Sequence, residues 1–155
     1  MNIPALYAKL DALLATLGGW TQHILLLALR LWWGWSFFLT GKGKLLDLEK
    51  PTAFFTELGI PLPKLNAILA GTTECFGGLL LLLGLFSRAA SVPLVFTMGV
   101  AYATAHREQL VKIFSDTDKF TEATPFLFLL ASLIVFSFGP GKLSLDALIF
   151  RKSAK

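Results

Sequence analysis

Four long runs of apolar residues, separated by segments that carry charge, dominate the pattern of this chain. They cover about residues 22–39, 65–86, 89–105 and 123–138. The hydrocarbon core of a bilayer is about 30 Å thick, and an apolar helix of roughly 20 residues crosses it. The pattern therefore predicts an all-α integral membrane four-helix bundle with antiparallel neighbours, and residues 1–155 as a single membrane domain.

Shorter amphipathic segments flank the four runs. Near the start, apolar residues recur at helical spacing, with Lys9 and Asp11 outside their stripe: Leu6, Leu10, Leu13, Leu14 and Leu17. This spacing predicts a short helix that lies on the membrane surface and ends near Gly18 and Gly19. After the fourth run, Ser144 follows a glycine- and proline-rich turn and is expected to cap a second short interfacial helix.

Composition supports the membrane class and limits the chemistry. Hydrophobic residues make up 55% of the chain and charged residues 15%, with a net charge of +4. The Lys and Arg residues lie between and after the apolar runs rather than on one face, so we expect the lipid bilayer as the partner and no nucleic acid. They divide almost evenly between the two sides of the membrane. The basic C-terminal tail and the compact turn at Arg88 favour cytoplasmic termini.

Few residues are suited to binding a metal or a redox group. Cys75 is the single cysteine, which excludes an internal disulfide and a CxxC pair. The two histidines, His23 and His106, fall at opposite ends of the predicted spans and cannot clamp one haem. No apolar run carries two His, Cys or carboxylate residues at ligand spacing, so no metal site is expected.

Two ionisable residues lie within the apolar runs. Arg30 is near the middle of the first run and Glu74 near the middle of the second. A charge in the bilayer core is costly, and mid-run residues of antiparallel neighbours fall at the same depth, so the sequence predicts an Arg30–Glu74 ion pair. That pair would either belong to a polar cavity or simply join two helices.

Further candidates gather on the side of the long first loop. Lys44, Tyr102, His106 and Glu122 all lie there and could form a polar mouth above the ion pair, unless they are polar only because water begins at that depth. The apolar loop segment of residues 54–63, closed by Pro61 and Pro63, could cover it. Two aromatic residues of the first run, Trp33 and Phe37, could stack on a flat ligand such as a quinone, or could simply pack against helices and lipid.

Four stretches of the chain resemble the DoxX family of small bacterial inner-membrane proteins. They are LRLWWGWSFFLTGKGKL, FFTELGIPLP, GTTECFGGLLLLLGLFSRAA and GPGKLSLDAL, and the resemblance extends over about residues 24–148. It implies a four-helix bundle in the bacterial inner (plasma) membrane. It also implies a redox setting, because relatives are described as the small membrane subunit of a thiosulfate:quinone oxidoreductase and as a membrane partner of superoxide dismutase and a sulfurtransferase. The family's polar positions match Arg30, Gly34, Lys44, Glu74, Gly77, Arg88 and Asp146.

Three functions are consistent with these features. The first is a small integral membrane subunit of a redox pathway, at most the membrane subunit of a quinone-linked oxidoreductase, with a non-covalently bound quinone and a protein partner or homodimer. The second is a non-enzymatic membrane scaffold or chaperone for a partner complex. The third is a small-anion carrier with Arg30 as the binding charge, although the chain shows no inverted repeat.

Overall fold

The computed structural model describes residues 3–150, except for the side chain of Ala5, and the regular structure of this part of the chain is entirely helical. The all-α prediction is therefore confirmed. In chain order the helices are α1 (Ile3–Leu46), α2 (Glu49–Glu57), α3 (Pro63–Leu83), α4 (Ser87–Thr104), α5 (Arg107–Val111), α6 (Thr117–Glu122), α7 (Pro125–Phe138) and α8 (Leu145–Ile149).

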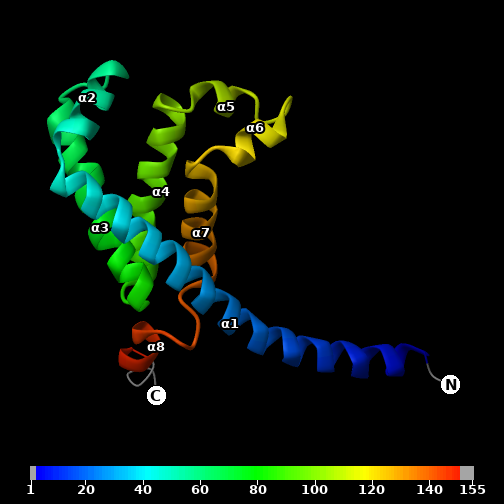
Figure 1. The fold of residues 1–155 in the computed structure, drawn as a ribbon. Coiled ribbons are helices and arrows are strands. Elements are labelled where there is room, and N and C mark those ends of the chain that lie inside the picture. Colours follow the sequence, from blue (N-terminus) through cyan, green and yellow to red (C-terminus); the bar gives the residue numbers. More distant parts are fainter. Residues whose placement is uncertain (1–2, 151–155) are drawn as a thin grey trace.

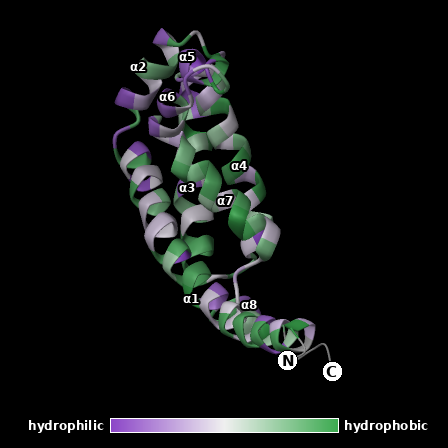
Figure 2. Ribbon diagram, turned by 90° about the vertical axis from the view of Figure 1, so that its right-hand side faces the viewer, coloured by the Kyte–Doolittle hydropathy of each residue, from purple (hydrophilic) through white to green (hydrophobic). Residues whose placement is uncertain are grey.

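The four longest helices pack side by side. Helix α1 runs along α3, α3 contacts α4, α4 packs on α7, and α7 returns to contact α1 (Figure 1). Helices α2, α5 and α6 lie at one end of this group, while α8 and the first part of α1 lie at the other end. Hydrophilic residues gather at the end formed by α2, α5 and α6, whereas α4 and α7 are largely hydrophobic (Figure 2).

Two of the described helices are long and apolar enough to cross a membrane: α1, from Leu6 to Leu46, and α3. Helix α7 is apolar but has only 14 residues. The length and composition of single helices therefore identify two candidate membrane spans.

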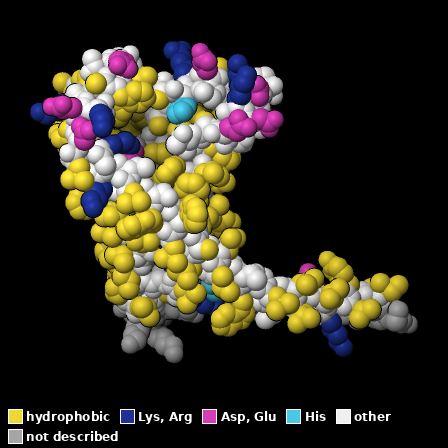
Figure 3. All heavy atoms as spheres, in the orientation of Figure 1, with side chains coloured by type: hydrophobic (Ala, Val, Ile, Leu, Met, Phe, Trp, Pro, Cys, Tyr) yellow, Lys and Arg dark blue, Asp and Glu magenta, His cyan; other side chains and the backbone are white. Residues whose placement is uncertain are grey.

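Helix α1 does not end near Gly18 and Gly19, so the prediction of a separate N-terminal helix is wrong. The helix continues through both glycines to Leu46. A glycine inside a helix costs only about 1 kcal/mol relative to alanine, which is too little to break a helix with strong helix formers on both sides. The first part of α1 projects away from the other helices as an arm, residues 3–21, and the described side chains of this arm are solvent-exposed (Figure 3).

Small residues bring α1 and α3 into close contact. A Cβ atom placed on Gly41 of α1 would lie 2.7 Å from the Cα atom of Cys75, and one on Gly78 of α3 would lie 2.6 Å from the Cβ atom of Phe37. Gly34 likewise faces the backbone of Leu82. The glycines thus let two helix backbones approach closely, as small residues do in membrane helix pairs.

The core of the protein lies where these helices meet. Its buried apolar side chains come from α1, α3, α4 and α7: Phe37, Leu81, Leu94, Met98 and Val135. Because one helix supplies only one or two of these residues, the core depends on all four helices being in place.

Candidate functional site

A cavity of about 960 Å³ opens at the end of the molecule formed by α2, α5 and α6. Helices α1, α2, α3 and α4 and the beginning of α7 enclose it, and Figure 3 shows a hollow at this end. Its walls are mainly apolar, with aromatic side chains from four of the helices: Phe37, Phe54, Phe55, Phe96 and Phe128. A few polar groups converge on this apolar space, which is the usual composition of a small-molecule site.

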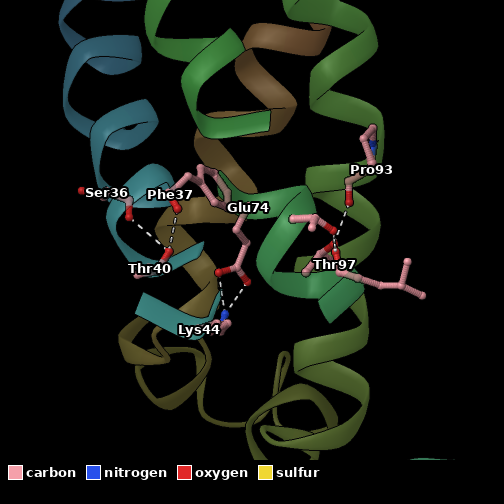
Figure 4. Close-up of polar contacts among 9 residues, drawn as sticks. Ser36, Phe37, Thr40, Lys44, Glu74, Pro93 and Thr97 are labelled. Atoms are coloured by element: carbon pink, nitrogen blue, oxygen red, sulfur yellow. Dashed lines mark hydrogen bonds and ion pairs between the residues drawn. The ribbon is translucent and has the colours of Figure 1, made fainter. Parts of the chain in front are cut away.

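An ion pair between Lys44 of α1 and Glu74 of α3 forms part of the cavity wall. The Lys44 Nζ atom lies 2.5 Å from both carboxylate oxygens (Figure 4). The Glu74 side chain is only 4% exposed, whereas that of Lys44 is 31% exposed. Glu74 therefore depends on Lys44 for its counter-charge, while Lys44 keeps partial access to solvent.

The nearby hydroxyl groups of Thr40 and Thr97 form their hydrogen bonds with backbone carbonyls rather than with this ion pair. Thr40 donates to the carbonyl oxygens of Ser36 and Phe37 at 3.1 and 3.0 Å, and Thr97 of α4 donates to that of Pro93 at 2.9 Å (Figure 4). Each hydroxyl is thus satisfied by the preceding turn of its own helix. Within the described residues, Lys44 is the hydrogen-bond donor to the Glu74 carboxylate.

Arg30 does not pair with Glu74, so the predicted Arg30–Glu74 ion pair is wrong. The Arg30 guanidinium donates instead to the carbonyl oxygens of Leu82, at 3.5 Å, and Leu143. The cause is the register of α1 on α3, which places Gly34 against Leu82 and so brings Arg30 to the end of α3. Ten residues of helix, or about 15 Å, separate Arg30 from the turn of α1 at residue 40 that approaches Glu74.

A second polar centre therefore surrounds Arg30 at the opposite end of the molecule. Asp146 attracts the Arg30 charge, and its two carboxylate oxygens accept from the backbone N–H groups of Phe86 and Ser87 at 2.7 and 3.0 Å. The Asp146 backbone N–H donates to the Gly84 carbonyl oxygen at 2.9 Å. Asp146 thus caps α4 and fastens the C-terminal segment to the turn between α3 and α4.

The short C-terminal helix begins where the sequence indicates. The Ser144 hydroxyl oxygen accepts from the Ala147 N–H at 3.2 Å, so Ser144 caps α8 as expected. The hydroxyl also donates to the Gly141 carbonyl oxygen at 2.7 Å, which ties the cap to the preceding turn.

The residues expected at the mouth are only partly brought together. Lys44 and His106 line the cavity. Tyr102 is buried beside it, where its hydroxyl donates to the Phe120 carbonyl oxygen at 2.8 Å and its ring stacks on that of Phe120. Glu122 is exposed at the end of α6 and lies outside the lining. The position of a residue near the end of a span does not decide which way its side chain points.

The two aromatic candidates of α1 also separate. Phe37 lines the cavity and packs edge-on against Phe128, with ring centroids 4.6 Å apart. Trp33 contacts the same Phe128 ring at 4.9 Å but is not part of the lining. Trp33 and Phe37 are one helical turn apart, yet only Phe37 faces the cavity, while Trp33 packs against Phe128 outside its lining.

Helix α2 supplies lining residues that the sequence indicated only as an apolar cover. Phe54, Phe55 and Leu58 of this segment lie against the cavity, together with Ile60. At its rim Lys50 lies 3.0 Å from Asp47, and this hydrogen-bonded lysine holds the pKa of the Asp47 carboxyl below its usual value. Thr97 and Phe128 carry no comparable signal in the sequence, because an apolar or hydroxyl residue on a long helix reads equally well as packing.

These features define an all-helical protein with two helices long and apolar enough to cross a membrane and a cavity whose wall contains a partly buried ion pair. The DoxX family model matches residues 25–107, which is more than half of the chain, and the protein belongs to the DoxX family of membrane proteins. The matched range contains Arg30, Lys44 and Glu74 but not Asp146.

The chain is also similar to the inner membrane protein YphA of Escherichia coli (strain K12), with 32% identity over 89 residues. The aligned part covers 57% of this chain and 64% of YphA, so the chain spans somewhat less than two thirds of that relative. No solved structure matches the chain.

Proposed function

We propose that this protein is a multi-pass protein of the bacterial inner membrane, in which part of α1 together with α3, α4 and α7 crosses the bilayer as a four-helix bundle. Family membership and the similarity to an inner membrane protein support this location. Large apolar side chains exposed on the outside of the helices, such as Trp32 at 71% and Phe76 at 61%, would face lipid. The arm of α1 and helix α8 share one end, which supports both termini on one side of the membrane, and the basic C-terminal tail favours the cytoplasm for that side.

The function we assign to the cavity is the binding of a flat apolar molecule, specifically the head group of a quinone. The cavity volume of about 960 Å³ is near the upper end of the range of about 300 to 1,000 Å³ for small-molecule pockets. Phe37, Phe55 and Phe128 provide aromatic faces for a planar ring, while Lys44 and His106 provide polar groups for its oxygen atoms. The residues present therefore fit the group.

The observation that carries the proposal is the Lys44–Glu74 pair in the cavity wall. A buried ion pair is often no more stabilising than two apolar side chains of the same volume, so packing alone does not account for it. The Lys44 ammonium group can donate a hydrogen bond to a ligand oxygen, and Glu74 holds that ammonium group in the cavity wall.

A bound quinone would supply two-electron acceptance coupled to protons. The electrons would come from a protein partner, which makes this chain the membrane subunit of a redox pathway rather than a complete enzyme.

A specific observation also favours a scaffold role as the second candidate. Val111 and Phe114, in the segment from α5 to α6, are 70% and 97% exposed at the polar end of the molecule. Apolar side chains at such a position suit docking of a partner protein. The anion-carrier role receives less support, because backbone carbonyls occupy the Arg30 guanidinium at the far end from the cavity.

The test is equilibrium binding of a short-chain ubiquinone to the purified protein in nanodiscs. We expect saturable binding that weakens about tenfold or more in Glu74→Gln and Phe55→Ala, because each removes a group in the wall. Trp35→Ala is the matched aromatic control, since Trp35 lies on α1 outside the lining. Absence of saturable binding, or equal binding by all four proteins, would favour the scaffold role instead.

A further inference from the structure

A second recess, of about 620 Å³, lies at the opposite end of the molecule from the cavity. It is formed by the start of α4, the end of α7, the following turn at Gly139–Gly141, and α8, with His23 of α1 at one edge. None of the residues that line it lines the cavity around Glu74. The recess is therefore a separate feature with its own chemistry.

Two cations in this recess have no counter-charge among the described residues. Arg88 donates one long hydrogen bond, at 3.3 Å, to the Ser137 carbonyl oxygen, and Lys142 lies 5.7 Å from the ring centroid of Trp20. Across residues 3–150, no carboxylate lies within ion-pair distance of either one. The carboxylate that lines the recess, Asp146, already accepts from two backbone N–H groups and faces Arg30. The recess is therefore electropositive.

Buried polar atoms on the same side also lack partners. Among the described residues, the His23 Nδ1 and the Arg30 Nε are buried and make no hydrogen bond. His23 lines the recess, and Arg30 lies behind it against Gly84 and Ser144. Buried polar groups are normally satisfied, so the unpaired His23 Nδ1 beside the cations Arg88 and Lys142 indicates a polar ligand in the recess.

The rim of the recess is apolar. Phe86, Phe138 and Phe150 are 55%, 63% and 47% exposed, and the rings of Phe86 and Phe150 lie 5.6 Å apart. A small soluble anion gains nothing from these aromatic surfaces. A ligand that combines a negative charge with hydrocarbon chains matches both the cations and the rim.

We propose that this recess binds the head group of an anionic phospholipid, with the phosphate oxygens at Arg88 and Lys142 and the acyl chains against the exposed phenylalanines. Basic pockets between helices at the cytoplasmic surface bind anionic lipids in this way. The proposal depends on the membrane location of the protein but not on quinone binding at the other end. A bound lipid would fasten α8 and the turn before it to the bilayer.

The test is native mass spectrometry of the detergent-purified protein with equal amounts of phosphatidylglycerol and phosphatidylcholine that carry identical acyl chains. We expect tighter binding of phosphatidylglycerol by the unaltered protein. One interfacial charge changes binding of an anionic lipid by about fivefold, so Arg88→Gln and Lys142→Gln should each reduce the preference by about that factor. Arg107→Gln, an exposed cation at the opposite end, is the matched control and should leave it unchanged.

Two further measurements separate the alternatives. Circular dichroism shows whether Arg88→Gln still folds, and Lys142→Gln tests the site without touching the Arg88 hydrogen bond to Ser137. Inorganic phosphate at millimolar concentration should fail to displace phosphatidylglycerol, because it lacks the acyl chains. Equal binding of both lipids, an unchanged preference in Lys142→Gln, or full displacement by phosphate would overturn the proposal. Ubiquinone binding should be the same in all of these variants.

Discussion

The Nζ atom of Lys44 on α1 lies 2.5 Å from both carboxylate oxygens of Glu74 on α3, in the wall of a cavity. The two charges differ in exposure, since Glu74 is sealed and Lys44 retains access to solvent. Replacing Lys44 and replacing Glu74 should therefore lower the free energy of unfolding by different amounts.

Replacing Lys44 by Met should lower the free energy of unfolding by about 2 to 3 kcal/mol, because it leaves a buried carboxylate without a counter-charge. Glu74→Gln should be milder, since the unpaired Lys44 can turn toward water. The double variant Lys44→Met, Glu74→Gln should be less destabilised than the sum of the two single variants. Thermal unfolding in detergent measures all three, and simple additivity would contradict a direct interaction.

Replacing Arg30 by Met should loosen the C-terminal segment rather than the cavity. The change removes charged hydrogen bonds to the Leu82 and Leu143 carbonyl oxygens, and such bonds are each worth about 1.5 to 3 kcal/mol. Hydrogen exchange of residues 139–150 should become faster, while that of residues 50–60 stays the same. Lys64→Met, at an exposed position of α3, is the control. Faster exchange around Glu74 instead would indicate that Arg30 supports the cavity directly.

Replacing Gly41 by Ala should separate α1 from α3. The added Cβ would lie 2.7 Å from the Cys75 Cα and 2.7 Å from the Gly71 carbonyl oxygen, and backbone atoms cannot move aside. We expect a loss of about 1 to 3 kcal/mol, as for other overpacked interiors. Gly99→Ala meets nothing within 4 Å and should be neutral or stabilising by up to about 1 kcal/mol. Equal melting temperatures for the two variants would argue against this close helix contact.

The end of the molecule formed by α5 and α6 should respond to acid. Asp116 caps α6, and its hydrogen bond with Lys119, 3.1 Å away, is the main cause that holds the pKa of its carboxyl below the usual value. Because the folded pKa is lower than the unfolded value of about 3.9, the stabilisation is complete above that value and is lost as the pH falls through the folded pKa.

The measurement is hydrogen exchange of residues 107–122 across an acid titration, corrected for the intrinsic pH dependence of exchange. Protection of α6 should fall only in strongly acidic solution. Asp116→Asn keeps a capping oxygen but cannot titrate, so this variant should lose the pH-dependent step. The same step in both proteins would assign it to another carboxyl group.

The proposed membrane topology places the two ends of the helix group on opposite sides. In a Cys75→Ser background, a cysteine at Thr56 on α2 should react with an impermeant maleimide added from the periplasm. A cysteine at Ser153 should react only after the membrane is permeabilised. Periplasmic labelling at Ser153 would reverse the orientation, and labelling at both positions from one side would contradict four spans.

The sequence alone was sufficient to predict the helices that form the body of the molecule. Each of the four apolar runs coincides with one of the long helices, because a run of that length buries its backbone hydrogen bonds within the helix and its side chains against neighbours. Ser144 likewise identified the start of α8, since a capping side chain acts on amides only two or three residues away.

Only the tertiary structure decided the register of α1 on α3 and the direction in which each side chain points. The prediction of an Arg30–Glu74 pair assumed that both apolar runs are centred at the same depth in the membrane. In the structure, glycine contacts set a different register of α1 on α3, and Glu74 pairs with Lys44. The assignment of Trp33 and Phe37 to one surface failed in part for a related reason, because a single turn separates the cavity wall from the packing behind it. Periodicity along one chain fixes where helices form, whereas the partner of a buried charge depends on how two helices slide and rotate against each other, and that is set by side-chain contacts between distant segments.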